Sequence, residues 1–171
     1  DALRGARCAR PHQPVGHVVT AALTPVLSVT GLNDWPDIQL YPIVDHVADK
    51  ICAMIERHGP HGHGSTRFRD LVDLVLIILR EEIDGVQLHT VLRTEIERRR
   101  RKGTSIELPQ HFAVPDAESW TSGYAKQAAN VDNLGEFTTL ESAEKLGAAF
   151  VDPLLSERTP GTWSPTALAW R

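Results

Sequence analysis

Two charged side chains, Lys50 and Asp70, fall where a helical wheel also places apolar residues. Lys50 lies at the margin of the apolar face of a predicted helix over 42–58, and Asp70 points in the direction of Leu74 and Ile77 in the next predicted helix. A lysine ammonium aimed into a cleft can hold a phosphate, and a carboxylate on an apolar face must be paired because an isolated buried charge is costly. The alternatives are structural: Lys50 covers apolar surface with its stem, and Asp70 bonds to a nearby arginine or lysine.

A run of positive residues ends a predicted helix over 85–102. Between Val91 and Lys102 six residues are positive and two are negative, so this stretch carries +4 and the rest of the chain carries −8. Such a run is either a solvated helix end favoured by the helix dipole or a contact for nucleic-acid phosphates. The candidate nucleic-acid contacts are Arg98, Arg99, Arg100, Arg101 and Lys102.

Other patterns of chemistry are weak. His58, His61 and His63 lie in a glycine-rich loop, which fixes no geometry for a metal, and no cysteine or carboxylate stands at a zinc spacing from them. The sequence has no phosphate-binding loop, dinucleotide fingerprint or nucleophile elbow. We therefore assign no residue as a metal ligand.

Hydrophobic periodicity predicts a mainly α fold. Five helices are expected, over 42–58, 66–80, 85–102, 117–131 and 140–151, of which the second is apolar on nearly every side and should be central to the core. Asp84, Asp116 and Thr138 or Thr139 are the expected N-caps, and Pro153 is expected to end the last helix. Residues 1–41 are expected to form one or two strands or extended stretches, and the tail from Glu157 a loop folded back on the bundle.

Composition bounds the class of protein. The chain has 171 residues and a net charge of −4, enough for one globular domain. Its longest apolar run, Leu74–Leu79, is far shorter than the roughly 20 residues of a membrane helix, and two cysteines cannot build a disulfide framework. No secretory signal is recognisable, so we expect a cytoplasmic protein without a membrane partner. The only methionine is Met54, so we expect a chain that was processed or trimmed, or that is part of a longer one.

Two motifs together resemble those of a known family. Asp45–Lys50 reads D-x-x-A-D-K, and Thr66–Asp73, about twenty residues later, reads T-R-x-R-D-L-x-D, with a Gly-Thr-Trp-Ser-Pro ending at 161–165. Their order and spacing resemble the AbiEii-like nucleotidyltransferase toxins, which occur in bacterial toxin–antitoxin and phage-defence pairs. The resemblance covers roughly residues 23–171, and the second motif is the more specific.

The resemblance implies a polymerase-β-like nucleotidyltransferase lobe followed by a helical lobe, with a nucleotide between them. Lys50 would hold the nucleoside triphosphate and act with Asp70 as a catalytic group, and Arg67 and Asp73 would be further nucleotide-binding candidates. Mg²⁺ and a nucleoside triphosphate are the expected cofactor and substrate of a full-length member. An RNA acceptor such as the 3′ end of a tRNA, and a cognate antitoxin, are the expected partners; placing RNA on residues 98–102 is our own inference.

One family motif is missing from the chain. The family's Gly-Ser turn and D-x-D strand, which supply metal-binding carboxylates, should lie well before Lys50, but residues 1–41 contain neither, their only acids being Asp1, Asp34 and Asp37. We therefore expect residues 1–41 to be a remnant of the nucleotidyltransferase lobe, residues 42–171 to be the helical C-terminal lobe, and the chain alone to be inactive. The alternatives are a non-catalytic RNA- or antitoxin-binding helical domain, and a helical domain whose motif residues only stabilise the core.

Overall fold

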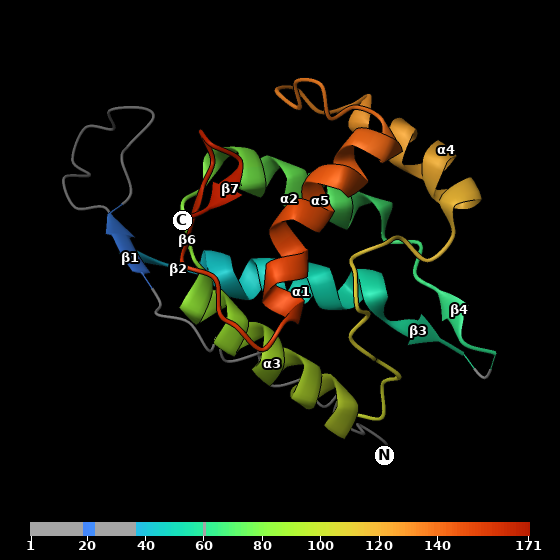
Figure 1. Cartoon of the computed structure of the whole chain (residues 1–171), viewed down its shortest axis with the longest axis horizontal. Coiled ribbons are helices and arrows are strands. Elements are labelled where there is room, and N and C mark those ends of the chain that lie inside the picture. Colours follow the sequence, from blue (N-terminus) through green and yellow to red (C-terminus); the bar gives the residue numbers. More distant parts are fainter. Residues whose placement is uncertain (1–18, 23–36, 60) are drawn as a thin grey trace, which may run out of the picture.

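The computed structural model describes residues 19–22, 37–59 and 61–171, and its architecture is mainly α, as predicted (Figure 1). The helices in this part of the chain are α1 (Ile43–Ile55), α2 (Phe68–Arg80), α3 (Gly85–Arg101), α4 (Ala117–Ala128) and α5 (Leu140–Leu155). The strands are β1 (Val19–Ala22), β2 (Asp37–Leu40), β3 (Arg57–His58), β4 (His63–Gly64), β5 (Ile83–Asp84), β6 (Thr162–Ser164) and β7 (Ala169–Trp170).

Helix α2 is the centre of the core, as its apolar sequence predicts. It packs against α1, α4 and α5, and α1 in turn packs against α3. Leu71, Leu74 and Ile78 of α2 are fully buried, and Leu76 and Ile77 are partly buried against the same cluster. A helix enclosed on several sides needs apolar residues around most of its circumference, which explains the near-continuous apolar run.

Three helix starts follow the capping chemistry expected from the sequence. The Asp84 carboxylate accepts a hydrogen bond of 2.9 Å from the backbone N–H of Gln87 at the start of α3. The Asp116 carboxylate accepts from two backbone N–H groups at the start of α4, and the Thr139 hydroxyl accepts from the backbone N–H of Ser142 in α5. Each cap satisfies donors that a helix leaves unpaired in its first turn.

The ends of three helices differ from the prediction by three residues or more, and one of these is α4, which stops at Ala128 instead of residue 131. Helix α1 stops at Ile55, and residues 57–58 pair with residues 63–64 in the antiparallel hairpin β3–β4, because Gly59 and Gly62 adopt positive φ angles of 71° and 63° that turn the chain. The prediction that Pro153 ends the last helix is wrong, because α5 continues to Leu155. A proline this close to the end removes a single late hydrogen bond, and the extension buries Leu154 completely.

The C-terminal tail does fold back on the bundle, but it contains strands where only a loop was expected. Strand β6 pairs with both β5 and β7, and Figure 1 shows this small sheet beside α2 and α5. The buried Trp163 donates its indole N–H to the carbonyl of Ile78 at 2.9 Å, and Trp170 donates to the carbonyl of Phe150 at 3.0 Å. These hydrogen bonds satisfy the only polar atom of each ring, so the tail closes the core without an unpaired indole donor.

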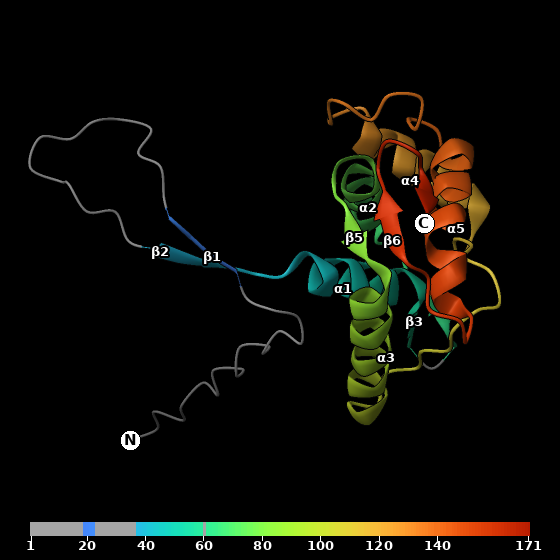
Figure 2. The same ribbon diagram turned by 60° about the vertical axis from the view of Figure 1, so that its left-hand side comes forward.

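The first described strands form a ribbon of their own. β1 pairs with β2 in antiparallel register, Val19 opposite Leu40, and Figure 2 shows the ribbon extending away from the helices. This agrees with the expected extended structure before residue 42, although residues 1–18 and 23–36, with most of that predicted segment, lie outside the described residues. Assignment of residues 1–41 to a nucleotidyltransferase lobe stays a prediction. Within the described residues, no helix combines the length and apolar character needed to cross a bilayer.

The α2–α4 contact provides a test of the packing. A Cβ atom added at Gly123 would lie 2.5 Å from the ring of Phe68, which packs edge-on against Trp120 at a centroid distance of 5.1 Å. We expect Gly123→Ala to lower the free energy of unfolding by about 1–2 kcal/mol, because an overpacking cost of about 2–3 kcal/mol outweighs the roughly 1 kcal/mol that alanine normally gains in a helix. Urea unfolding followed by circular dichroism measures this.

The neighbouring Ser122→Ala substitution, on the exposed side of α4, is the matched control and should change stability by less than about 0.5 kcal/mol. A Gly123→Ala variant as stable as the unchanged protein would contradict the close contact of α4 with Phe68.

Candidate nucleotide site and charge clusters

Lys50 projects from α1 onto the first turns of α2. Its Nζ atom lies 2.8 Å from Oδ2 of Asp73 and 3.4 Å from Oδ1 of Asp70. The Lys50 side chain is 16% exposed, so its ammonium lies at the edge of the core rather than out in solvent. The expectation that Lys50 lies on the margin of the apolar face is confirmed, and its head is held by two carboxylates.

Asp70 is nearly buried and is shared between two cations. Its side chain is only 7% exposed, and its second oxygen accepts a hydrogen bond of 2.6 Å from Nε of Arg67. One turn further on, Asp73 also lies 3.7 Å from Nε of Arg69. The pairing that the sequence required for a carboxylate on an apolar helix is therefore present.

The structure thus brings together all four residues predicted for nucleotide binding or catalysis, and adds Arg69. We call Lys50, Arg67, Arg69, Asp70 and Asp73 the Lys50 cluster. Arg69 was not singled out from the sequence, although its spacing of four residues from Asp73 is the spacing of helical ion pairs. Helices α1 and α2 run in opposite directions (Figure 1), which places the middle of α1 beside the start of α2.

The Lys50 cluster has chemistry suited to an anion. Three cations face two carboxylates, which leaves one net positive charge. The hydrogen bond from Arg67 to Asp70 raises the pKa of Arg67 above its ordinary value. The Arg67 and Arg69 side chains are 58% and 67% exposed, so their guanidinium groups can turn toward a phosphate while Lys50 stays fixed below them.

The basic run at the end of α3 is divided between internal ion pairs and solvent. The mostly buried Arg99 forms ion pairs with Glu95, with Asp49 at 2.6 Å, and with Glu56, which follows α1. Arg98 also bonds to Glu95, and Arg100 donates to Glu97 and to the carbonyl of Ile106. Arg101 and Lys102 are exposed, with no ion pair in the described part of the chain. The nucleic-acid role of residues 98–102 stays a prediction, and these two side chains are the most available for it.

Arg99 and Glu95 form a buried pair whose charges reinforce each other. Burial alone would lower the pKa of Arg99, but the hydrogen bond to Glu95 and the neighbouring negative charges raise it overall. For Glu95 burial acts to raise the pKa, yet the hydrogen bonds from Arg98 and Arg99 outweigh it and hold the pKa below its ordinary value. Both groups are therefore charged near neutral pH. The pair lies within α3, and Arg99 in turn links α3 to α1 through Asp49.

The described residues do not fit a magnesium site. No group of three or more His, Cys, Asp or Glu side chains in residues 19–22, 37–59 and 61–171 is arranged to hold a metal ion. The carboxylates that contact Lys50, those of Asp70 and Asp73, already bind cationic side chains. No step of the chemistry is therefore assigned to a metal held by these residues.

The buried Glu95 pair predicts a pH dependence of stability. Because the pKa of Glu95 is lower in the folded than in the unfolded chain, its contribution is present above the unfolded value and is lost as the pH falls through the folded one. Glu95→Gln should destabilise the protein at pH 7, and the difference from the unchanged protein should shrink below about pH 4.3, the usual glutamate value. Urea unfolding at about pH 7, 5 and 3.5, which lie on both sides of the usual glutamate pKa, measures this difference in unfolding free energy.

The exposed Glu97→Gln substitution, which affects only a surface pair with Arg100, is the control and should change stability little at any of these pH values. A Glu95→Gln effect of the same size at neutral pH and in acid would show that the stabilisation does not come from the charge of the Glu95 carboxylate.

Comparison with known proteins identifies a family over a range that contains both motifs. A family model described as "Nucleotidyl transferase AbiEii toxin, Type IV TA system" matches residues 17–163. No curated protein and no solved structure matches the chain. The matched range includes the whole Lys50 cluster, the basic run and the buried Trp163. This chain belongs to the nucleotidyl transferase AbiEii toxin family of type IV toxin–antitoxin systems.

Proposed function

We propose that the Lys50 cluster binds the triphosphate of a nucleoside triphosphate for transfer of the nucleotide to an RNA acceptor such as the 3′ end of a tRNA. The supporting observation is the pairing of Lys50 with both Asp70 and Asp73, which fixes a partly buried ammonium beside two exposed arginines. An ammonium fixed in this way is already oriented for a phosphate oxygen, so little conformational entropy is lost on binding.

In this proposal the residues of the chain bind and orient the triphosphate. Lys50 contacts a phosphate oxygen, and Arg67 and Arg69 neutralise charge on the others, while Asp70 and Asp73 act as positioning residues for these cations. The acceptor hydroxyl oxygen attacks the α-phosphorus, a new P–O bond forms, the bond to the bridging α–β oxygen breaks, and pyrophosphate leaves. The hydroxyl proton is lost to solvent.

The family also implies Mg²⁺, an antitoxin and a cytoplasmic setting, in which nucleotides and tRNA are available. Mg²⁺ would neutralise the triphosphate and the developing charge. Because residues 1–171 have no D-x-D motif before Lys50, and the described residues offer no metal site, we propose that this chain alone does not complete the transfer. The second candidate function, a non-catalytic domain that binds RNA or an antitoxin, is favoured by the same missing carboxylates.

Binding of ATP by the chain tests the role of Lys50. We expect Lys50→Ala to weaken the binding of a fluorescent ATP analogue by roughly tenfold or more, because it removes a charge-assisted contact of about 1.5–3 kcal/mol. Lys126→Ala, at an exposed position on α4, is the matched control and should leave the dissociation constant unchanged. Equal binding by Lys50→Ala and the unchanged chain would remove Lys50 from this role.

Measurements of unfolding free energy distinguish a purely structural role of the motif residues from a role in nucleotide binding. Lys50→Ala leaves the nearly buried Asp70 with one cation fewer and should cost about 1–3 kcal/mol of unfolding free energy. The second variant, Arg69→Ala, removes an exposed cation whose ion pair stabilises the fold little, yet it should also weaken ATP binding. Loss of stability in Lys50→Ala with no change of ATP binding in either variant would favour the structural role.

Transfer itself is tested with labelled nucleoside triphosphates, Mg²⁺ and total tRNA. We expect residues 1–171 alone to add no label to tRNA above background, because the chain lacks the D-x-D carboxylates before Lys50. The acceptor is separated by gel electrophoresis and counted, with Lys50→Ala as the control for a contaminating enzyme. Label on tRNA that disappears in Lys50→Ala would contradict the proposed inactivity and would confirm Lys50 in the reaction.

A further inference from the structure

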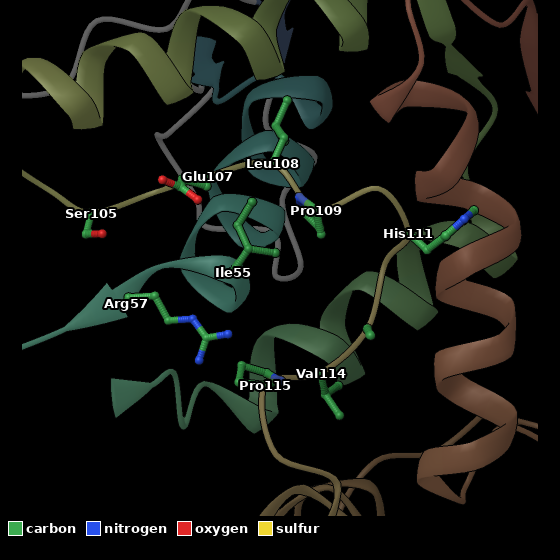
Figure 3. A pocket seen from close by; sticks show the side chains of 10 residues that line it. Ile55, Arg57, Ser105, Glu107, Leu108, Pro109, His111, Val114 and Pro115 are labelled. Atoms are coloured by element: carbon green, nitrogen blue, oxygen red, sulfur yellow. The ribbon is translucent and has the colours of Figure 1, made fainter. Parts of the chain in front are cut away.

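A pocket of about 460 Å³ opens on another part of the molecule. It lies between the end of α1, strand β3 and the extended connection over residues 105–115 (Figure 3). Its volume is within the range of small-molecule sites. Ile55, Leu108 and Val114 provide an aliphatic wall, and Arg57, Ser105 and Glu107 provide polar groups.

Arg57 is a cation whose backbone is fixed and whose head has no partner among the described residues. Its backbone N–H donates to the carbonyl of Ser105 at 3.0 Å, and on the other side it pairs with Gly64 across the hairpin. Figure 3 shows its guanidinium reaching into the pocket toward Pro115. No ion pair or hydrogen bond within residues 19–22, 37–59 and 61–171 involves this guanidinium, in contrast to Arg67 and Arg99. An unpaired guanidinium in a pocket suits an anionic ligand.

Ser105 and Glu107 are directed to the pocket by the residue between them. In an extended segment side chains alternate, and Ile106 is 3% exposed, so its two neighbours must point to the opposite side. The carbonyl of Ile106 is held by Nε of Arg100 at 3.1 Å, which fixes the segment. Both side chains line the pocket, and Figure 3 shows them at its edge.

The imidazole of His111 belongs to a different contact. Although His111 lines the pocket, its Nδ1 atom lies 3.2 Å from a carboxylate oxygen of Asp152 on α5, and Figure 3 shows the ring directed toward that helix. Among the described residues, no other aromatic side chain lines the pocket, so it offers little surface for stacking a base. The polar groups available to a ligand are therefore a guanidinium, a hydroxyl and a carboxylate.

We propose that this pocket binds a ribonucleotide unit, either as a free nucleotide or within an RNA strand. Arg57 holds the phosphate, and Glu107 accepts a hydrogen bond from the ribose 2′-hydroxyl, while the aliphatic wall covers the sugar and one face of the base. A carboxylate in the same pocket as the guanidinium penalises a ligand that is only an anion and favours one that also presents hydroxyl donors, as in the acidic residue that binds ribose in dinucleotide sites. The site is separate from the Lys50 cluster and does not depend on transfer.

The test measures binding by the 171-residue chain without Mg²⁺ or nucleoside triphosphate. The probes are 5′-AMP and 5′-dAMP, and a short single-stranded RNA with its DNA counterpart. We expect the ribose form of at least one pair to bind roughly tenfold more tightly, because a carboxylate acceptor left unpaired costs affinity. Binding of AMP identifies a free nucleotide as the ligand, and binding of the RNA alone identifies a strand.

Two substitutions separate the roles within the pocket. Arg57→Ala should weaken binding of the ribose probe by roughly tenfold or more. Glu107→Ala should instead bring the ratio of the affinities for the ribose and deoxyribose probes close to one. The matched controls are Arg80→Ala and Glu82→Ala, exposed residues at and after the far end of α2, which is about 20 Å long. Neither control should change either quantity.

Further variants keep the proposal falsifiable if a charge change alters folding. Ala113→Trp places a large ring in the pocket and should block the probe, with circular dichroism showing the fold retained. Equal binding of ribose and deoxyribose probes, no binding of any probe, or unchanged binding by Arg57→Ala would each overturn the proposal. Binding lost in Lys50→Ala but kept in Arg57→Ala would assign the ligand to the Lys50 cluster instead, and would also overturn it.

Discussion

The placement of opposite charges on α1 organises the helical body. Asp49 and Lys50 are consecutive, so their side chains leave the helix about 100° apart and reach different neighbours. Asp49 pairs with Arg99 of α3, and Lys50 pairs with Asp70 and Asp73 of α2. Each contact crosses between helices at the edge of the apolar core, where burial makes an unpaired charge costly. The two contacts therefore fix how α2 and α3 lie against α1.

Closure of the core by the tail keeps this arrangement in place. The carbonyl of Gly161 accepts a hydrogen bond from the N–H of Gly85, and the next strand residues carry Trp163 into contact with Phe150 at a ring distance of 4.9 Å. The same tail covers the end of α2, because the indole N–H of Trp163 donates a hydrogen bond to the carbonyl of Ile78. The start of α2, which carries most of the Lys50 cluster, and its end are thus both held by residues far away in the sequence.

Local patterns predicted much of this structure, and long-range pairing explains what they missed. The helical periods, the caps at Asp84 and Asp116 and the edge position of Lys50 depend on residues a few positions apart, which the sequence contains explicitly. The short strands of the tail and the burial of Arg99 depend on partners far away in the sequence, such as Asp49. In the same way, the pocket around Arg57 exists only because residues 105–115 return to β3.

The two proposed anion sites differ in what a ligand must displace. A phosphate at the Lys50 cluster competes with Asp70 and Asp73 for cations already paired, so a ligand with several negative charges gains more there than one with a single phosphate. Arg57 has no such partner in the described chain, and a single phosphate suffices to pair it. This difference suits a triphosphate donor at the first site and a nucleotide monophosphate unit at the second. In the proposed function, the carboxylates of the Lys50 cluster thus provide selectivity as well as stability.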